Sequence, residues 1–193
     1  MLGLKLPTDP RWVHLAEMSI EEILIDHAYC EQKAATNCIG LIQLYPDKPY
    51  LVDRLTPVVI EEWTHFKMVL DELKKRNMSL GYQRKDKYVG ELMTFMRKGG
   101  RSDDRFLDKM LMSAMIEARS CERFRLLSEG ISDPDLKDFY HKLMIAEALH
   151  YSMFIDIAVK YIDKEIVKKR WEEWLEFEAS VMKNLEVRGD RVH

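Results

Sequence analysis

Two copies of a Glu-x-x-His pattern stand out in the sequence, at residues 62–65 and 147–150. An isolated glutamate precedes each copy at a nearly equal interval, Glu31 by 31 residues and Glu117 by 30. Residues three apart share a helix face, so one carboxylate and one imidazole can reach the same ion. Four helices that carry this set provide two matched half-sites for a pair of metal ions. The predicted ligands are Glu31, Glu62, His65, Glu117, Glu147 and His150.

The residue types also indicate which metal such a site would take. Oxygen and imidazole ligands without a thiolate favour iron or manganese over a structural zinc, and this pattern alone leaves those two metals open. All six residues lie on stripes of apolar residues spaced by three and four, which are the core-facing sides of amphipathic helices. Four buried carboxylates in one core need cations to neutralise them. Because these stripes carry no lysine or arginine, metal ions fit better than a buried salt-bridge network.

Other polar residues near the predicted ligands are candidates for supporting roles. His27 lies one turn before Glu31 on the same stripe, and we favour a supporting or packing role over an additional ligand. Tyr151 follows His150 and could donate a hydrogen bond, although packing is the commoner role for such a tyrosine. Three acidic residues are candidates only because they are near the ligands in sequence: Asp26, Glu61 and Asp156.

Helix start and stop signals define the elements that must position these residues. Ser19-Ile20-Glu21-Glu22 has the capping-box pattern, and Pro46 and Pro49 stop the helix that it opens. Pro57 is expected either to kink the second helix or to start its main part. The predicted helices span about residues 20–44, 51–76, 102–130, 134–162 and 164–185.

The connections between these helices predict the fold. Short loops join the first helix to the second and the third to the fourth, so each pair is antiparallel. Residues 77–101 form a long connection that can run back along a helix of this length. The sequence therefore predicts an all-α, ferritin-like four-helix bundle with one long crossover and an additional C-terminal helix at 164–185. We expect residues 1–193 to form a single domain.

Composition agrees with a helical protein that does not enter membranes. The 193 residues are 47% hydrophobic and 33% charged, and no apolar run approaches the roughly 18 residues that a membrane span requires. The N-terminal residues lack the long apolar stretch of a secretion signal. Three cysteines without a Cys-x-x-Cys pattern argue against a disulfide framework. These features favour a cytoplasmic location.

The long connection carries a concentration of positive charge. Residues 74–105 contain ten basic and four acidic residues, a net charge of +6 in a chain whose overall charge is −3. Tyr82, Tyr88 and Phe95 are interleaved with these charges. Basic residues alternating with aromatic ones suit nucleic acid, although a solvated connector is also common. The candidate nucleic-acid-binding residues are Arg84, Lys85, Lys87, Arg97, Lys98 and Arg101.

Several segments together resemble one known family. They are IDHAYCEQKAA at 25–35, EEWTHF at 61–66, IEARSCERF at 116–124 and EALHY at 147–151, with PTDPRW at 7–12. These segments resemble the tRNA 2-methylthio-N6-isopentenyladenosine hydroxylases (the MiaE-like family), and the resemblance covers nearly the whole chain.

The resemblance implies a non-haem di-iron monooxygenase that acts on tRNA. Such an enzyme hydroxylates the isopentenyl group of a modified adenosine beside the anticodon, using O2 and two electrons from an unidentified donor. Two iron ions would be held by the six predicted ligands, with Glu62 and Glu117 as bridges. The modified base would have to leave the anticodon-loop stack to reach the irons.

Two other functions suit the same ligands. One is a ferritin-like iron-binding protein or ferroxidase, which should take up many irons per chain. The other is a di-iron oxygenase that acts on a small molecule and has no affinity for tRNA. Metal content and salt-dependent tRNA binding would separate these alternatives from the hydroxylase. The sequence leaves the oligomeric state, the oxidised carbon and the use of free nucleoside open.

Overall fold

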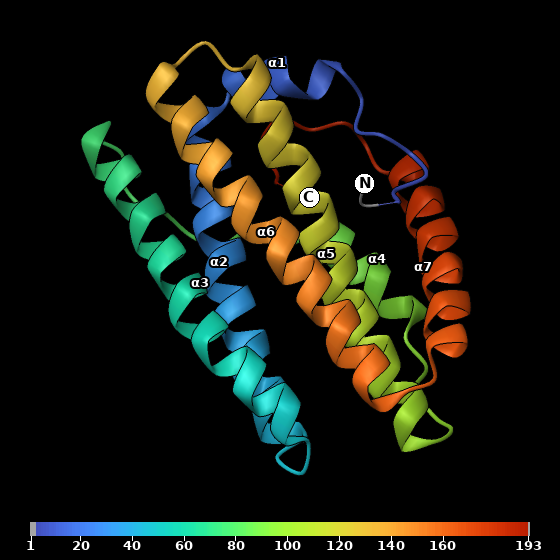
Figure 1. Cartoon of the computed structure of the whole chain (residues 1–193). Helices are drawn as coiled ribbons and strands as arrows, with labels where there is room; N and C mark the ends of the chain where they lie inside the picture. The colour runs from blue at the N-terminus through green and yellow to red at the C-terminus, as the bar shows by residue number, and fades with distance from the viewer. Residues whose placement is uncertain (1–2, 193) are drawn as a thin grey trace. The chain divides into compact units, whose positions relative to one another are not determined.

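The computed structural model describes residues 3–192, which form seven α-helices and no β-strand (Figure 1). The five predicted helices are all present, with ends within two residues of those expected. Two short helices, α1 and α4, were not predicted. In chain order the helices are α1 (Arg11–Glu17), α2 (Ile20–Leu44), α3 (Pro49–Lys75), α4 (Lys87–Phe95), α5 (Ser102–Gly130), α6 (Pro134–Tyr161) and α7 (Lys164–Asn184).

The described chain divides into two compact units, each built around one pair of long helices. The α2–α3 unit comprises residues 12–85 and 188–192. The α5–α6 unit comprises residues 3–11 and 86–187. Each unit therefore combines segments that are far apart in the sequence.

In the α2–α3 unit, α2 and α3 pack against each other as an antiparallel pair joined by a short loop (Figure 1). Pro49 occupies the first turn of α3, where its missing N–H costs nothing. Pro57 lies inside α3 and does not start it, which corrects one of the two expected roles. The apolar faces of the pair supply buried residues such as Leu24, Leu55 and Val69.

The start of α2 differs from the predicted capping box. Ser19 occupies the N-cap position, but its side chain makes no capping hydrogen bond. Its backbone N–H donates to the carbonyl of Ala16 at 3.0 Å, in the tight turn that follows α1. With φ −128° and ψ 39°, Ser19 lacks the extended backbone that usually directs a cap side chain at the helix. The unpredicted helix α1 is therefore the reason for this difference.

In the α5–α6 unit, α5 and α6 form the second long pair, and α7 packs on α4, α5 and α6. Aspartates cap three of its helices: Asp86 accepts from Val89 N–H at α4, and Asp133 and Asp163 cap α6 and α7 in the same way. These caps define where α4, α6 and α7 begin.

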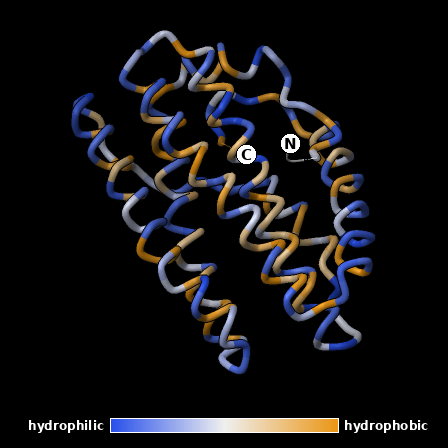
Figure 2. The backbone as a smooth tube through the Cα atoms, in the orientation of Figure 1, coloured by the Kyte–Doolittle hydropathy of each residue, from blue (hydrophilic) through white to orange (hydrophobic). Residues whose placement is uncertain are grey.

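Hydrophobic and hydrophilic residues alternate along every long helix (Figure 2). Among residues 3–192, no helix has the combination of length and apolar character that crossing a membrane requires. The fold class is all-α and ferritin-like, with four long helices, a long connection that contains α4, and the additional C-terminal helix α7.

Candidate metal centre

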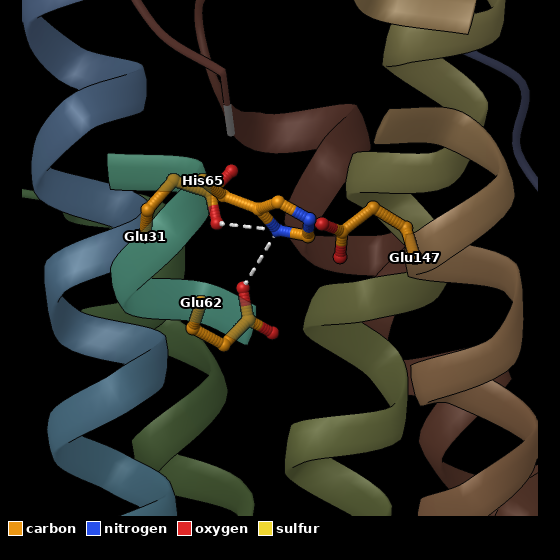
Figure 3. Close-up of side chains that lie close together, drawn as sticks. All are labelled: Glu31, Glu62, His65 and Glu147. Atoms are coloured by element: carbon orange, nitrogen blue, oxygen red, sulfur yellow. Dashed lines mark hydrogen bonds and ion pairs between the residues drawn. The ribbon is translucent and has the colours of Figure 1, made fainter. Parts of the chain in front are cut away.

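Three of the predicted ligands lie together in the α2–α3 unit. Glu31 comes from α2, whereas Glu62 and His65 lie one turn apart on α3, and all three are buried. Each offers a ligand atom within 4.8 Å of the others. His65 Nδ1 lies 3.3 Å from Glu62 Oε2 and 3.7 Å from Glu31 Oε2 (Figure 3, which also labels Glu147 of α6).

The electrostatics of this half-site favour a cation. Burial acts to lower the pKa of His65, but hydrogen bonding and attraction to Glu31 and Glu62 outweigh it and raise that pKa to about 10. Burial acts to raise the pKa of Glu31, but His27 and His65 hold it well below its usual range. Without metal, the proton on His65 therefore supplies positive charge between two carboxylates. A divalent ion can replace that proton, because it binds the same donor atoms.

His27 supports Glu31 in this half-site. The fully buried His27 places Nε2 2.6 Å from Glu31 Oε1, one helical turn away. This contact agrees with the supporting role expected for His27, because it orients one oxygen of Glu31.

The other three predicted ligands lie together in the α5–α6 unit. Glu117 comes from α5, and Glu147 and His150 lie one turn apart on α6. All three are buried, and each offers a ligand atom within 4.8 Å of the others. The two units therefore each hold the same set of donors, two carboxylates and one imidazole.

Glu117 differs from the other buried carboxylates of its unit. Asp108 is bound by Arg97 and Arg170, and Glu178 is bound by Arg119. Glu117 has no hydrogen-bond or ion-pair partner among residues 3–192. A buried carboxylate without a counter-charge is strongly unfavourable. This environment fits a metal ligand, and the ligand roles of all six residues, with the bridging roles of Glu62 and Glu117, stay predictions.

The remaining supporting candidates do not lie in the half-sites. The Asp26 carboxylate accepts a hydrogen bond from Val192 N–H at 2.8 Å and so holds the C-terminal segment. Glu61 and Asp156 are exposed. The ring of Tyr151 packs against Trp171 with centroids 5.7 Å apart, and burial raises its pKa.

A buried charge network in the α5–α6 unit was missed by sequence reasoning. Arg119 donates to Glu178 Oε1 at 2.7 Å and also pairs with Glu122, and Thr8 Oγ1 donates to Glu122 at 2.7 Å. Arg119 and Glu178 are both fully buried. A signal was present in the sequence: Glu178 lies on the apolar side of α7 with Trp174 and Val181.

The basic connection provides fewer free charges than its composition suggests. Arg84 is engaged by Asp190, and Arg97 by Asp108 and Asp104. Four of the six candidate nucleic-acid-binding residues are exposed: Lys85, Lys87, Lys98 and Arg101.

The aromatic residues of this connection also differ in accessibility. Tyr88 is buried and donates to Glu178, and Phe95 stacks on Phe177 with centroids 4.3 Å apart. Only Tyr82 among the three is exposed.

The fold and these half-sites define a class: ferritin-like proteins with buried clusters of carboxylate and histidine side chains that could hold metal ions. The model of one family, described as "tRNA-(MS[2]IO[6]A)-hydroxylase (MiaE)", matches residues 2–193. The chain belongs to this family.

Individual relatives agree with this assignment. The chain is 34% identical over 161 residues to a protein of Pseudomonas putida named tRNA 2-(methylsulfanyl)-N(6)-isopentenyladenosine(37) hydroxylase, covering 83% of this chain and 77% of the relative. A Salmonella typhimurium protein of the same name is 26% identical over 228 residues, covering 93% and 83%.

A solved structure is similar over almost the whole chain. It is described as "Protein 43 with aldehyde deformylating oxygenase activity from Synechococcus". The TM-score is 0.93 at 34% identity, with 98% of this chain and 94% of that chain covered. This similarity confirms the ferritin-like fold class.

Proposed function

We propose that the chain is a non-haem di-iron monooxygenase that hydroxylates the isopentenyl group of 2-methylthio-N6-isopentenyladenosine next to the anticodon of tRNA. Membership of the hydroxylase family over residues 2–193 is the observation that carries this proposal. All six residues of the proposed metal site are buried.

Two iron ions would supply the activation of O2. Each half-site offers two carboxylates and one imidazole, and iron accepts this set of ligands. His27 would support the metal by fixing the orientation of Glu31, since its Nε2 lies 2.6 Å from Glu31 Oε1. Burial of the ligands keeps bulk water away from the reacting atoms.

The proposed reaction balances with an external reductant. One oxygen atom of O2 enters a C–H bond of the isopentenyl group, and the other leaves as water. Two electrons and two protons are consumed, and a separate electron donor supplies the electrons. A tRNA substrate fits a cytoplasmic location. The exposed side chains of Lys85, Lys87, Lys98 and Arg101 would offer positive charge to its phosphates.

A single-turnover experiment tests the proposal. Iron-loaded protein is reduced chemically, then mixed with O2 and tRNA that carries the unhydroxylated modification, and the nucleosides are analysed by mass spectrometry. We expect the modified adenosine to gain one oxygen atom, labelled when 18O2 is used. tRNA without the isopentenyl group is the control. No gain with two irons bound per chain would contradict the proposed function.

A second function is favoured by one observation, the similarity to a structure described with aldehyde deformylating oxygenase activity. Under this alternative, the iron-loaded protein, supplied with O2 and excess chemical reductant, deformylates an aldehyde and leaves the tRNA unchanged. Running both substrates in parallel separates the two functions, because each predicts a different product.

A further inference from the structure

The chain between α3 and α4 forms an extended segment that is fixed at several points. Residues 78–85, here called the Tyr82 segment, contain no helix or strand and belong to the α2–α3 unit. The beginning of the segment is set by the end of α3. Asn77 has φ 58°, and the N–H groups of Asn77 and Met78 donate to the carbonyls of Lys74 and Leu73. This is a Schellman motif, so the direction in which the chain leaves α3 is defined.

The middle of the segment is bound to α2. The Tyr29 hydroxyl donates to the carbonyl of Gly81 at 2.9 Å. Gly81 has φ +62°, and a Cβ at this position would lie 3.4 Å from Ile25 Cδ1. Glycine therefore allows both the backbone conformation and the close approach to α2.

Arg84 binds the end of the segment. Its guanidinium donates to the Asp190 carboxylate at 2.9 Å, to the Asp190 carbonyl at 2.7 Å and to the Glu22 carbonyl at 2.8 Å. Arg84 is thus a structural anchor, and its charge is already paired. The tRNA-binding role that the sequence indicates for Arg84 stays a prediction.

Between these anchors, Tyr82 extends into solvent. Its side chain is 94% exposed, although its neighbours Gly81 and Arg84 are both held. Lys85, which ends the segment, is exposed and has no ion-pair partner among residues 3–192. The fold therefore presents an aromatic ring and a free cation on a backbone of fixed position.

We propose that the Tyr82 segment binds an unpaired nucleotide of the tRNA anticodon loop, with the Tyr82 ring stacked on a base and Lys85 on a phosphate. The inference rests on the proposed function, which makes tRNA the partner. Loop nucleotides offer unstacked bases, and an aromatic ring accepts any base face. The exposed charge of Lys85 complements the phosphates of a polyanion. Since the anchors fix the backbone before binding, little conformational entropy is lost when the base stacks.

Equilibrium binding of the fluorescently labelled, unhydroxylated tRNA tests the stacking role. Tyr82→Ala should weaken binding roughly 5- to 150-fold, the range for loss of one base–aromatic stack, and Tyr82→Phe should stay within about twofold of wild type. Equal weakening in both variants would contradict stacking, because phenylalanine keeps the ring. Tyr50→Ala removes a half-buried tyrosine ring at the opposite end of α3, so it serves as the control and should bind normally.

The salt dependence of binding tests Lys85. Lys85→Ala should reduce the slope of log K against log salt by about 0.7, the value for one single-strand phosphate contact. Lys168→Ala removes an equal charge from an exposed position on α7 and should leave the slope unchanged. An unchanged slope for Lys85→Ala would remove Lys85 from the interface.

Failure of this inference is distinguishable from failure of the proposed function. If wild type neither binds nor hydroxylates the tRNA, both fail together. If wild type does both and Tyr82→Ala binds equally well, only the inference fails. Sedimentation of wild type and of Tyr82→Ala tests whether a second copy of the chain covers the Tyr82 segment instead. If Tyr82→Ala loses an oligomer that wild type forms and binds tRNA as well as wild type does, the segment is a contact between copies of the chain.

Discussion

His65 is the residue whose charge depends most on what its half-site holds. Its pKa of about 10 means that the imidazole is protonated at neutral pH when no metal is bound. Because this pKa is above the ordinary value of 6.5, the group stabilises the folded metal-free chain fully below about pH 6.5. The contribution is lost as the pH rises through about 10.

Metal binding to the α2–α3 half-site should therefore release a proton. At pH 7 we expect about one proton from His65 when Fe²⁺ binds the chelator-treated protein, and tighter binding as the pH rises toward 10. Calorimetry in buffers of different ionisation enthalpy under anaerobic conditions measures the release. His65→Gln is the control. Because it lacks the imidazole, it should not release this proton when Fe²⁺ binds. Equal release by wild type and the variant would contradict the assignment.

Adjacent residues on α3 give a direct test of the ligand assignment. Glu62→Ala should reduce bound iron to one ion per chain or fewer, because it removes a buried ligand, while helical content is retained. Glu61→Ala removes the same group from an exposed position and should keep full iron content. Metal analysis with circular dichroism measures both. Glu147→Ala should cause the same loss of bound iron in the half-site of the α5–α6 unit. Normal iron content in this variant would contradict the assignment of Glu147 as a ligand.

At the scale of helices, buried ion pairs connect the elements of the α5–α6 unit. Arg119 of α5 binds Glu178 of α7, and Arg170 of α7 binds Asp108 of α5. Burial acts to raise the pKa of Asp108, but the hydrogen bonds from Arg97 and Arg170 lower it overall. These pairs determine which face of α7 lies against α5, because a different register would leave charges buried without partners.

Removal of Arg119 should reveal the cost of an unpaired buried charge. Arg119→Ala should lower the free energy of unfolding by about 3–5 kcal/mol, because Glu178 loses its main partner. Arg125→Ala breaks an exposed pair with Glu129 on the same helix and should cost less than about 1 kcal/mol. Urea denaturation compares the two. Equal stability of the two variants would contradict a stabilising role for the buried pair between Arg119 and Glu178.

The elements that the sequence predicted well are those with regular apolar periodicity and clear caps. Asp133 before Pro134 defines the start of α6 by a local interaction, so no tertiary information is needed. The six ligand candidates could be found because their spacing follows helix geometry. By contrast, α1 is short, and a helix of this length depends on the burial of Trp12 and Ala16. Periodicity could not reveal that dependence.

The pairing of distant charges also lay outside what the sequence could predict. Arg84 and Asp190 are 106 residues apart, and nothing local distinguishes Arg84 from the exposed Lys85 beside it. For this reason the sequence showed the positive charge of the connection at residues 77–101. It could not show that Arg84 is held by Asp190 while Lys85 is exposed.

At the scale of the whole molecule, the last described residues complete the α2–α3 unit. Val192 is fully buried, its N–H donates to Asp26, and Trp12 Nε1 donates to the carbonyl of Arg191 at 3.3 Å. Gly189 passes so close to α1 that an added Cβ would lie 2.2 Å from the Leu15 carbonyl carbon.

Substitution of Gly189 should therefore destabilise this unit. Gly189→Ala should lower the free energy of unfolding by about 1–3 kcal/mol, because the new methyl group overlaps the α1 backbone. Tryptophan fluorescence during urea denaturation measures the free energy of unfolding, with Trp12 as one of the four tryptophans that contribute to the signal. Gly99→Ala is the control, since a Cβ there meets no atom within 4 Å. Equal stability of both variants would show that residues 188–192 do not need this close approach.

Because the α2–α3 unit combines residues 12–85 with residues 188–192, it can be completed only late in the synthesis of the chain. Residues 12–85 are translated first among the elements of their unit, yet the hydrogen bonds that join Asp26, Arg84 and Trp12 to residues 188–192 can form only when those last residues follow. Nascent chains stalled before residue 188 should keep Trp12 accessible to protease or quencher, and chains extended beyond residue 192 should protect it. Completion of the α2–α3 unit would then follow the synthesis of nearly the whole described chain.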